Sequence, residues 1–247
     1  MDDFCSDSDL GYLRSRTRFA PGEKLRLDEA YRLAHLPLIA PDHPDVIRSR
    51  PGATYRMGRH ERNYSLVLPV PPDALEGSVA YRELKADLRD APFADKIAWD
   101  LLTRRREKLH ATICGSLSMD VPHRVSDGER AALKRLGPLR VELRGLFSGN
   151  VNVGRLYLRV YPECRNGANS LREIQRILGR PETDLYLVGL FNFLDHLDSM
   201  EAEALRDLIE RWWDRPILTL DVVSLWLLGA SDDLVLEAGV EDLIPLV

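Results

Sequence analysis

The chain has few cysteines and no long apolar run. Its three cysteines, Cys5, Cys114 and Cys164, include no Cys-x-x-Cys pair, so it lacks the pattern of a disulfide-stabilised secreted domain or of a zinc site. No segment approaches the ~20 apolar residues that a transmembrane helix needs, and the acidic N-terminus has no apolar stretch typical of a signal peptide. We therefore expect a cytoplasmic protein without a membrane partner.

Positive charge is not in excess either. The chain has 34 Lys and Arg residues against 39 Asp and Glu residues, and its net charge is −5. A protein that coats nucleic acid normally has an excess of basic residues, so we expect no DNA duplex as partner, although a local basic patch remains compatible. The length of 247 residues suits one large domain or two small lobes.

Residues 1–60 differ in composition from the rest. They are rich in Arg, Asp and Pro and contain one amphipathic piece at 27–36. Prolines between 37 and 51 exclude a long helix there. We interpret 1–60 as an irregular N-terminal extension that packs on a core; a partly disordered tail is the alternative.

A regular pattern of strands and helices begins near residue 64. Apolar alternation predicts strands at 64–70, 108–114, 139–147, 154–161, 185–194, 217–228 and 234–246. Helix-start patterns at 73–76, 126–129 and 170–173 and an amphipathic stretch from Ser199 predict the helices between them. The succession strand-helix-strand-helix-strand thus occurs twice, which indicates an α+β protein of two related, intertwined lobes within 61–247, with approximate halves 61–150 and 151–247.

The strand at 108–114 carries reactive side chains on one face. Alternation places His110, Thr112 and Cys114 on one side of the strand and apolar residues on the other. His110 and Thr112 are about 6.6 Å apart at Cα, close enough to act on one phosphate-sized group. Cys114 is about 13 Å from His110 at Cα, too far for a Cys-His nucleophilic pair.

The order of these segments resembles the 2H phosphoesterase superfamily, the LigT-like RNA cyclic phosphodiesterases. The similarity runs from about residue 62 to the end, through the segments 64–71, 108–113, 139–147, 154–160, 218–228 and 234–246. It implies two lobes with antiparallel sheets around a central cleft and a monomer that needs no metal or other cofactor. One His-x-Thr motif from each lobe would face the cleft, with one histidine as general base and the other as general acid.

The resemblance assigns His110 and Thr112 as catalytic residues. The implied substrate is a cyclic nucleotide or the 2′,3′-cyclic phosphate at an RNA end, with Thr112 as phosphate ligand. The second motif is degenerate, because 185–194 contains no histidine. Depending on register, its positions fall on Val188 and Leu190 or on Leu190 and Asn192, and His196 follows in a turn.

Losing one histidine of such a pair removes an acid or base worth about 10²–10⁴-fold in rate. A non-catalytic protein that binds a nucleotide or an RNA end on the same scaffold is therefore the alternative function. A third possibility is an interaction protein whose residues 1–60 dock a partner or cover the cleft.

Other polar groups are candidates for binding substrate. Arg155, Tyr157, Arg159 and Tyr161 share one face of a strand, which either lines the cleft or is simply solvated. We select Tyr157, Arg159 and Asn192 as substrate-binding residues. There are also two basic clusters, each of which is either solvated or in contact with phosphate. The first is Arg104, Arg105 and Arg106. The second, which could also supply the missing acid, is Arg56, Arg59, His60 and Arg62.

Overall fold

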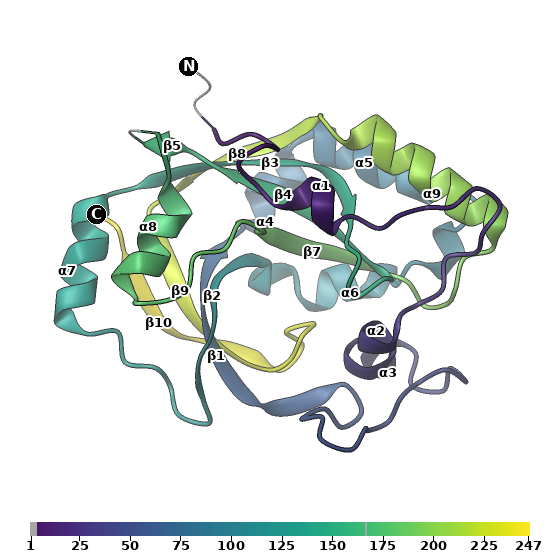
Figure 1. The fold of residues 1–247 in the computed structure, drawn as a ribbon, viewed down its shortest axis with the longest axis horizontal. Coiled ribbons are helices and arrows are strands. Elements are labelled where there is room, and N and C mark those ends of the chain that lie inside the picture. The colour runs from purple at the N-terminus through teal and green to yellow at the C-terminus, as the bar shows by residue number, and fades with distance from the viewer. Residues whose placement is uncertain (1–3, 166) are drawn as a thin grey trace.

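The computed structural model describes residues 4–165 and 167–247. Its main element is one curled antiparallel sheet of eight strands in the order β10-β9-β1-β2-β7-β4-β3-β8 (Figure 1). The strands are β1 (Arg59–Pro69), β2 (His110–Met119), β3 (Leu139–Ser148), β4 (Arg155–Pro162), β7 (Leu187–Asn192), β8 (Pro216–Val222), β9 (Ser224–Asp232) and β10 (Ala238–Pro245). A hairpin of β5 (Cys164–Arg165) and β6 (Ala168–Asn169) follows β4. The predicted α+β class is confirmed.

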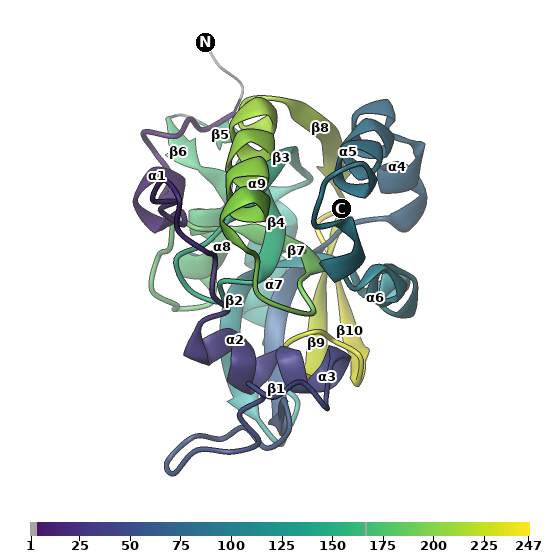
Figure 2. The same ribbon diagram turned by 90° about the vertical axis from the view of Figure 1, so that its right-hand side faces the viewer.

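Helices flank the sheet. They are α1 (Tyr12–Ser15), α2 (Glu29–Ala34), α3 (Leu36–Ile39), α4 (Pro72–Gly77), α5 (Val79–Arg89), α6 (Trp99–Arg104), α7 (Asp127–Leu136), α8 (Ser170–Ile177) and α9 (Ser199–Trp212). The longer ones divide between the two halves of the sheet: α9 packs on β3 and α5 on β8, whereas α7 packs on β10 and α8 on β2 (Figures 1 and 2).

The helix starts follow local capping chemistry, with corrections to the predictions. The capping box predicted at Ser126 is present, and Asp198 forms another one before α9. Helix α8 is capped by the side chain of Asn169 and not by Ser170. The box predicted at Asp73 does not form, because Pro72 already occupies the first turn of α4; Ser78 caps the next helix instead.

The strand predicted at 217–228 is two strands. The chain breaks at Val223, so β8 lies at one edge of the sheet while β9 pairs with β1 and β10. The following strand begins at 238 and not at 234, because residues 232–235 form a turn in which the amide of Val235 donates to the carbonyl of Asp232. Asp232 is the last residue of β9, and Asp233 lies in this turn.

The sheet is continuous, whereas the sequence led us to expect separate antiparallel sheets on either side of a cleft. Its two four-stranded halves, β10-β9-β1-β2 and β7-β4-β3-β8, meet at β2 and β7. That seam has a single register pair, Ala111 with Val188. Backbone pairing at this one point is enough to join the halves into one sheet.

Residues 4–60 form short helices and loops that pack against the sheet. Tyr12 of α1 is fully buried, and its hydroxyl donates to the carbonyl of Val160 in β4 over 2.6 Å. Tyr31 of α2 is also fully buried and donates to the carbonyl of Phe193 after β7. Full burial of one such aromatic ring stabilises a fold by roughly 1.5–3 kcal/mol. The segment is therefore anchored at two points, Tyr12 and Tyr31, to the central strands or the residue that follows them.

Across residues 4–165 and 167–247, no helix has both the length and the apolar character needed to cross a membrane.

Candidate functional site

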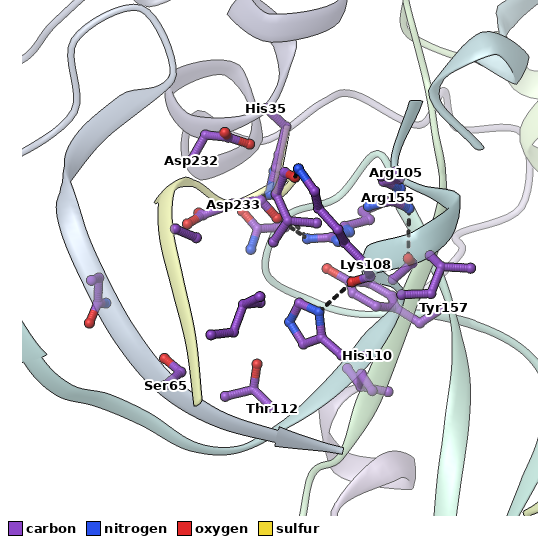
Figure 3. A pocket seen from close by; sticks show the side chains of 18 of the residues that line it. His35, Ser65, Arg105, Lys108, His110, Thr112, Arg155, Tyr157, Asp232 and Asp233 are labelled. Atoms are coloured by element: carbon purple, nitrogen blue, oxygen red, sulfur yellow. Dashed lines mark hydrogen bonds and ion pairs between the residues drawn. The ribbon is translucent and has the colours of Figure 1, made fainter. Parts of the chain in front are cut away.

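A cavity of about 330 Å³ lies at the seam of the sheet, between β1, β2, β4, β7 and the turn that follows β9 (Figure 3). Its lining is mostly polar. The polar residues that matter for its chemistry are His35, His60, Ser65, Arg105, Lys108, His110, Thr112, Arg155, Tyr157, Asp232 and Asp233.

His110 and Thr112 both line this cavity. The Nδ1 atom of His110 lies 2.8 Å from the carbonyl oxygen of Lys108. A carbonyl only accepts, so Nδ1 carries the proton and Nε2 keeps its lone pair. Burial lowers the pKa of His110 to about 4, against the opposing hydrogen bond to Lys108 and with help from the charges of Arg155 and Arg105. His110 is therefore a neutral proton acceptor at neutral pH.

Strand β7 faces the cavity with Leu187 and Gly189. The predicted register, which used Val188, Leu190 and Asn192, is wrong for this cavity by one residue. Val188 and Leu190 are fully buried in the core, and their packing sets which face of the strand is apolar. Asn192 is also fully buried and does not line the cavity.

The guanidinium of Arg155 lies directly over Gly189. A Cβ atom at position 189 would lie only 2.2 Å from Nε of Arg155. Nη1 of Arg155 donates to the carbonyl of Asp233 over 3.1 Å and lies 3.4 Å from Nε2 of His35. The absence of a side chain at position 189 thus lets the guanidinium lie against the strand.

Two further cations surround the same space. Arg105 is buried and donates to the carbonyl oxygens of Gly189 (2.6 Å) and Leu190 (2.5 Å), and burial lowers its pKa to about 9. Lys108 has only distant carbonyl contacts, at 3.3 and 3.4 Å. Among the described residues, no carboxylate oxygen lies within 4.0 Å of the charged nitrogens of Arg105, Lys108 or Arg155. An anion would complete their interactions.

Asp233 organises the other wall of the cavity. It accepts a hydrogen bond from the hydroxyl of Tyr55 (2.8 Å) and lies 3.3 Å from Nε2 of His60 and 3.9 Å from Nε2 of His35. Burial alone would raise the pKa of Asp233, but the contacts with His60 and Tyr55 and the charge of His60 lower it to about 2. Asp233 therefore stays ionised.

The two histidines beside Asp233 differ. His35 is fully buried, and burial together with the charge of Arg155 lowers its pKa to about 3. His60 has a raised pKa, because its interaction with Asp233 outweighs its burial. The sequence offered no signal for His35 or Asp233, which lie in unremarkable contexts; His60 was noticed only as part of a basic cluster.

Of the predicted substrate-binding residues, Tyr157 lines the cavity and Arg159 does not. Arg159 is fully buried on the same strand and donates to the hydroxyl of Tyr161 and the carbonyl of Trp213. Its guanidinium also stacks over the ring of Trp213 at 3.8 Å and lies 3.4 Å from Asp7. The N-terminal segment covers this end of β4. Arg159 is therefore neither part of the cavity nor solvated.

The remaining candidates lie outside the cavity lining. His196 accepts from the amide of Leu27 at Nδ1 and donates to Asp45 from Nε2 over 2.6 Å. Four arginines of the two basic clusters form surface ion pairs: Arg59 with Glu237, Arg62 with Glu241, Arg104 with Asp100 and Arg106 with Asp73. These contacts favour the solvated interpretation for most of both clusters.

Within the described parts of the chain, no group of three or more His, Cys, Asp or Glu side chains is arranged to hold a metal ion. No protein-family model matches the sequence, and no curated protein matches it. The geometry of the cavity therefore carries the functional argument.

Proposed function

We propose that the cavity is the active site of a metal-independent phosphodiesterase of the 2H, LigT-like type. In this proposal the two four-stranded halves of the sheet are its two lobes, and the chain acts as a monomer on a cyclic nucleotide or on the 2′,3′-cyclic phosphate of an RNA end. The observation that carries the proposal is the free Nε2 of His110 beside Thr112, in a cavity where Arg105, Lys108 and Arg155 have no carboxylate partner among the described residues.

Each residue has a stated role in this proposal. Nε2 of His110 takes the proton of the attacking water, and the hydroxyl of Thr112 donates to a non-bridging oxygen. Arg155 and Lys108 balance the charge of the phosphoryl group. Because the positive charge of Arg155 helps to lower the pKa of His110, a bound phosphate would raise that pKa and strengthen the base.

The test is hydrolysis of a 2′,3′-cyclic nucleotide in the presence of a chelator. His110→Ala should reduce turnover by at least about 10²-fold, and Thr112→Val by a smaller factor. His196→Gln alters a histidine outside the cavity and should leave turnover unchanged. If the wild-type protein hydrolyses no member of a panel of cyclic and linear phosphodiesters, the enzymatic proposal is wrong.

A non-catalytic nucleotide or RNA-end binding protein is the second candidate. It is favoured by β7, where Leu187 and Gly189 take the cavity positions and neither can transfer a proton. This candidate predicts binding of nucleoside 2′- or 3′-monophosphates without any hydrolysis of the cyclic compounds. Calorimetry should then show weaker binding for Arg155→Met than for the wild type.

A further inference from the structure

The cavity contains a histidine on β1, opposite in protonation state to His110. We infer that His60 is the proton donor to the leaving oxygen in the reaction proposed above. The inference rests on that proposed function and deepens it, because it assigns the acid that β7 does not provide.

The contacts of His60 define its state. Nδ1 lies 2.6 Å from the carbonyl oxygen of Glu61, and Nε2 lies 3.3 Å from a carboxylate oxygen of Asp233. A carbonyl only accepts, so Nδ1 carries a proton; the carboxylate of Asp233 beside Nε2 favours a second proton there and raises the pKa of His60. His110 has one such contact and a free lone pair. The cavity thus holds one histidine ready to accept a proton and one ready to donate.

The surroundings indicate which proton is transferred. The Nδ1 contact is short, whereas the Nε2 contact is 0.7 Å longer (3.3 against 2.6 Å), so the Nε2 proton is the less firmly held. Asp233 is fixed by the hydroxyl of Tyr55 and by the main-chain turn after β9. The pairing of Arg59 with Asp232 in the β1–β9 ladder places His60 beside this turn. Asp232 adds negative charge. Arg155 donates to the carbonyl of Asp233, and His35 lies 3.9 Å from the carboxylate oxygen that His60 does not contact.

The step balances. The water oxygen forms a bond to phosphorus while its proton passes to Nε2 of His110. The bond from phosphorus to the leaving oxygen breaks while that oxygen takes the Nε2 proton of His60. His110 ends as the imidazolium and His60 as the neutral ring, and exchange with solvent restores both.

The experiment compares two substrates that differ in their need for an acid. A 2′,3′-cyclic nucleotide expels a ribose hydroxyl that must be protonated, whereas bis(p-nitrophenyl) phosphate expels a stable phenolate. His60→Gln should lower kcat on the first substrate by about 10²–10³-fold and on the second by less than 5-fold, as a rough bound. The alkaline limb of the wild-type pH–rate profile should disappear in this variant. Retained activity on the phenyl ester shows that the variant folds; His60→Asn repeats the test if His60→Gln does not.

The outcomes separate the inference from the proposed function. Wild-type turnover that His110→Ala abolishes and His60→Gln leaves intact overturns the role of His60 alone. An equal loss on both substrates also overturns it, because it indicates a positioning residue and not a proton donor. If the wild type turns over neither substrate, both proposals are overturned together.

A second observation, independent of the cavity, concerns Cys5 and Cys164. Their sulfur atoms are 2.8 Å apart, and the amide of Cys5 donates to the carbonyl of Pro162 over 2.8 Å. An antiparallel bridge between Phe4 and Glu163 fixes the same approach. Both thiols are free, with Cys5 buried and Cys164 half-buried. We propose that this pair is a site of reversible disulfide formation by exchange with a small disulfide such as oxidised glutathione.

The exchange begins at the accessible sulfur. The thiolate of Cys164 attacks the small disulfide and releases one glutathione thiolate. The Cys5 sulfur, on losing its proton, then displaces the second glutathione and forms the protein disulfide. Burial and the neighbouring Cys164 raise the pKa of Cys5 to about 12, so the second step should be the slower one and should accelerate with pH.

Intact-mass analysis tests this proposal. After incubation with oxidised glutathione and alkylation in denaturant, the wild type should carry one alkyl group, on Cys114, and the reduced protein three. The melting temperature should rise by roughly 5–10 °C, because the bond closes a long loop. Cys5→Ser should lose both effects. Three alkyl groups after oxidation, or a stable adduct of one glutathione on Cys164, would overturn the proposal.

Discussion

Strands β2 and β7 occupy matching positions on either side of the seam but present opposite chemistry to the cavity. Ala111 pairs with Val188, so the residues flanking this pair can be compared directly. On β2 they are His110 and Thr112; on β7 they are Leu187 and Gly189, and all four line the cavity. The polar groups on this side of the cavity come from other elements, such as Arg155 of β4 and Asp233 of the turn after β9.

Arg155 is the cation that lies over β7 on its side of the seam, and the proposed function makes it a phosphate ligand. Removing the charge of Arg155 should have the largest effect on ligand binding. Arg155→Met should raise KM for a cyclic nucleotide, or Kd for a nucleoside monophosphate, by about 10–150-fold, because a hydrogen bond to a charged group contributes about 1.5–3 kcal/mol. The measurement is steady-state kinetics or calorimetry at one fixed salt concentration.

Arg159 on the same strand is the matched control. Arg159→Met should leave KM and Kd unchanged, since Arg159 lies under the N-terminal segment and outside the cavity. It should lower the free energy of unfolding by about 1–3 kcal/mol, because the hydroxyl of Tyr161 and the carbonyl of Trp213 lose a buried donor. Equal effects of the two variants on binding would show that the cavity is not the ligand site.

Gly189 offers a second test of the position of the Arg155 guanidinium, with a smaller expected effect. In Gly189→Ala the new methyl group would meet the guanidinium of Arg155, which must move aside while keeping its charge. We expect affinity to fall by up to about 10-fold, within the range for one misplaced charged hydrogen bond. Gly115→Ala on β2 is the control. The methyl group added there would meet Cγ2 of Thr112 at 3.7 Å, which is an ordinary contact. If Gly189→Ala binds like the wild type, the guanidinium is not a ligand.

The sequence predicted the parts of this site that depend on local alternation. His110 and Thr112 share a face because side chains alternate along β2, and the same rule placed Tyr157. Alternation could not give the phase of β7, because Leu187, Val188 and Leu190 are all apolar and either face could be the core face. The register was therefore missed by one residue.

The missed residues depend on long-range contacts. His35 and Asp233 are almost 200 residues apart in sequence and meet only because His35 and the following helix α3 lie against the turn after β9. Arg159 follows the same alternation as Tyr157, and nothing local reveals that Asp7 and Trp213 cover it. Fold class was predictable from periodicity, whereas the joining of the two half-sheets depends on one backbone pair, which leaves no pattern in the side chains.

His35 gives the smallest and most specific test, through stability and not turnover. Its pKa is lowered to about 3 in the folded protein, against an ordinary value near 6.5. Between these values the unfolded chain binds one proton more, so the free energy of unfolding falls as the pH falls, by about 1.4 kcal/mol per pH unit. His110, with a pKa lowered to about 4, adds a similar slope, whereas His60, with a raised pKa, is protonated in both states below pH ~6.5 and adds none.

His35→Gln should therefore reduce the slope of unfolding free energy against pH by about 1.4 kcal/mol per unit between about pH 6 and 4.5. Urea unfolding at a series of pH values measures it, and shifts from exposed carboxylates cancel in the difference from the wild type. An unchanged slope would mean that His35 takes up a proton in the folded state, next to Asp233. The wall of the cavity formed by His35, His60 and Asp233 would then be more cationic than we infer.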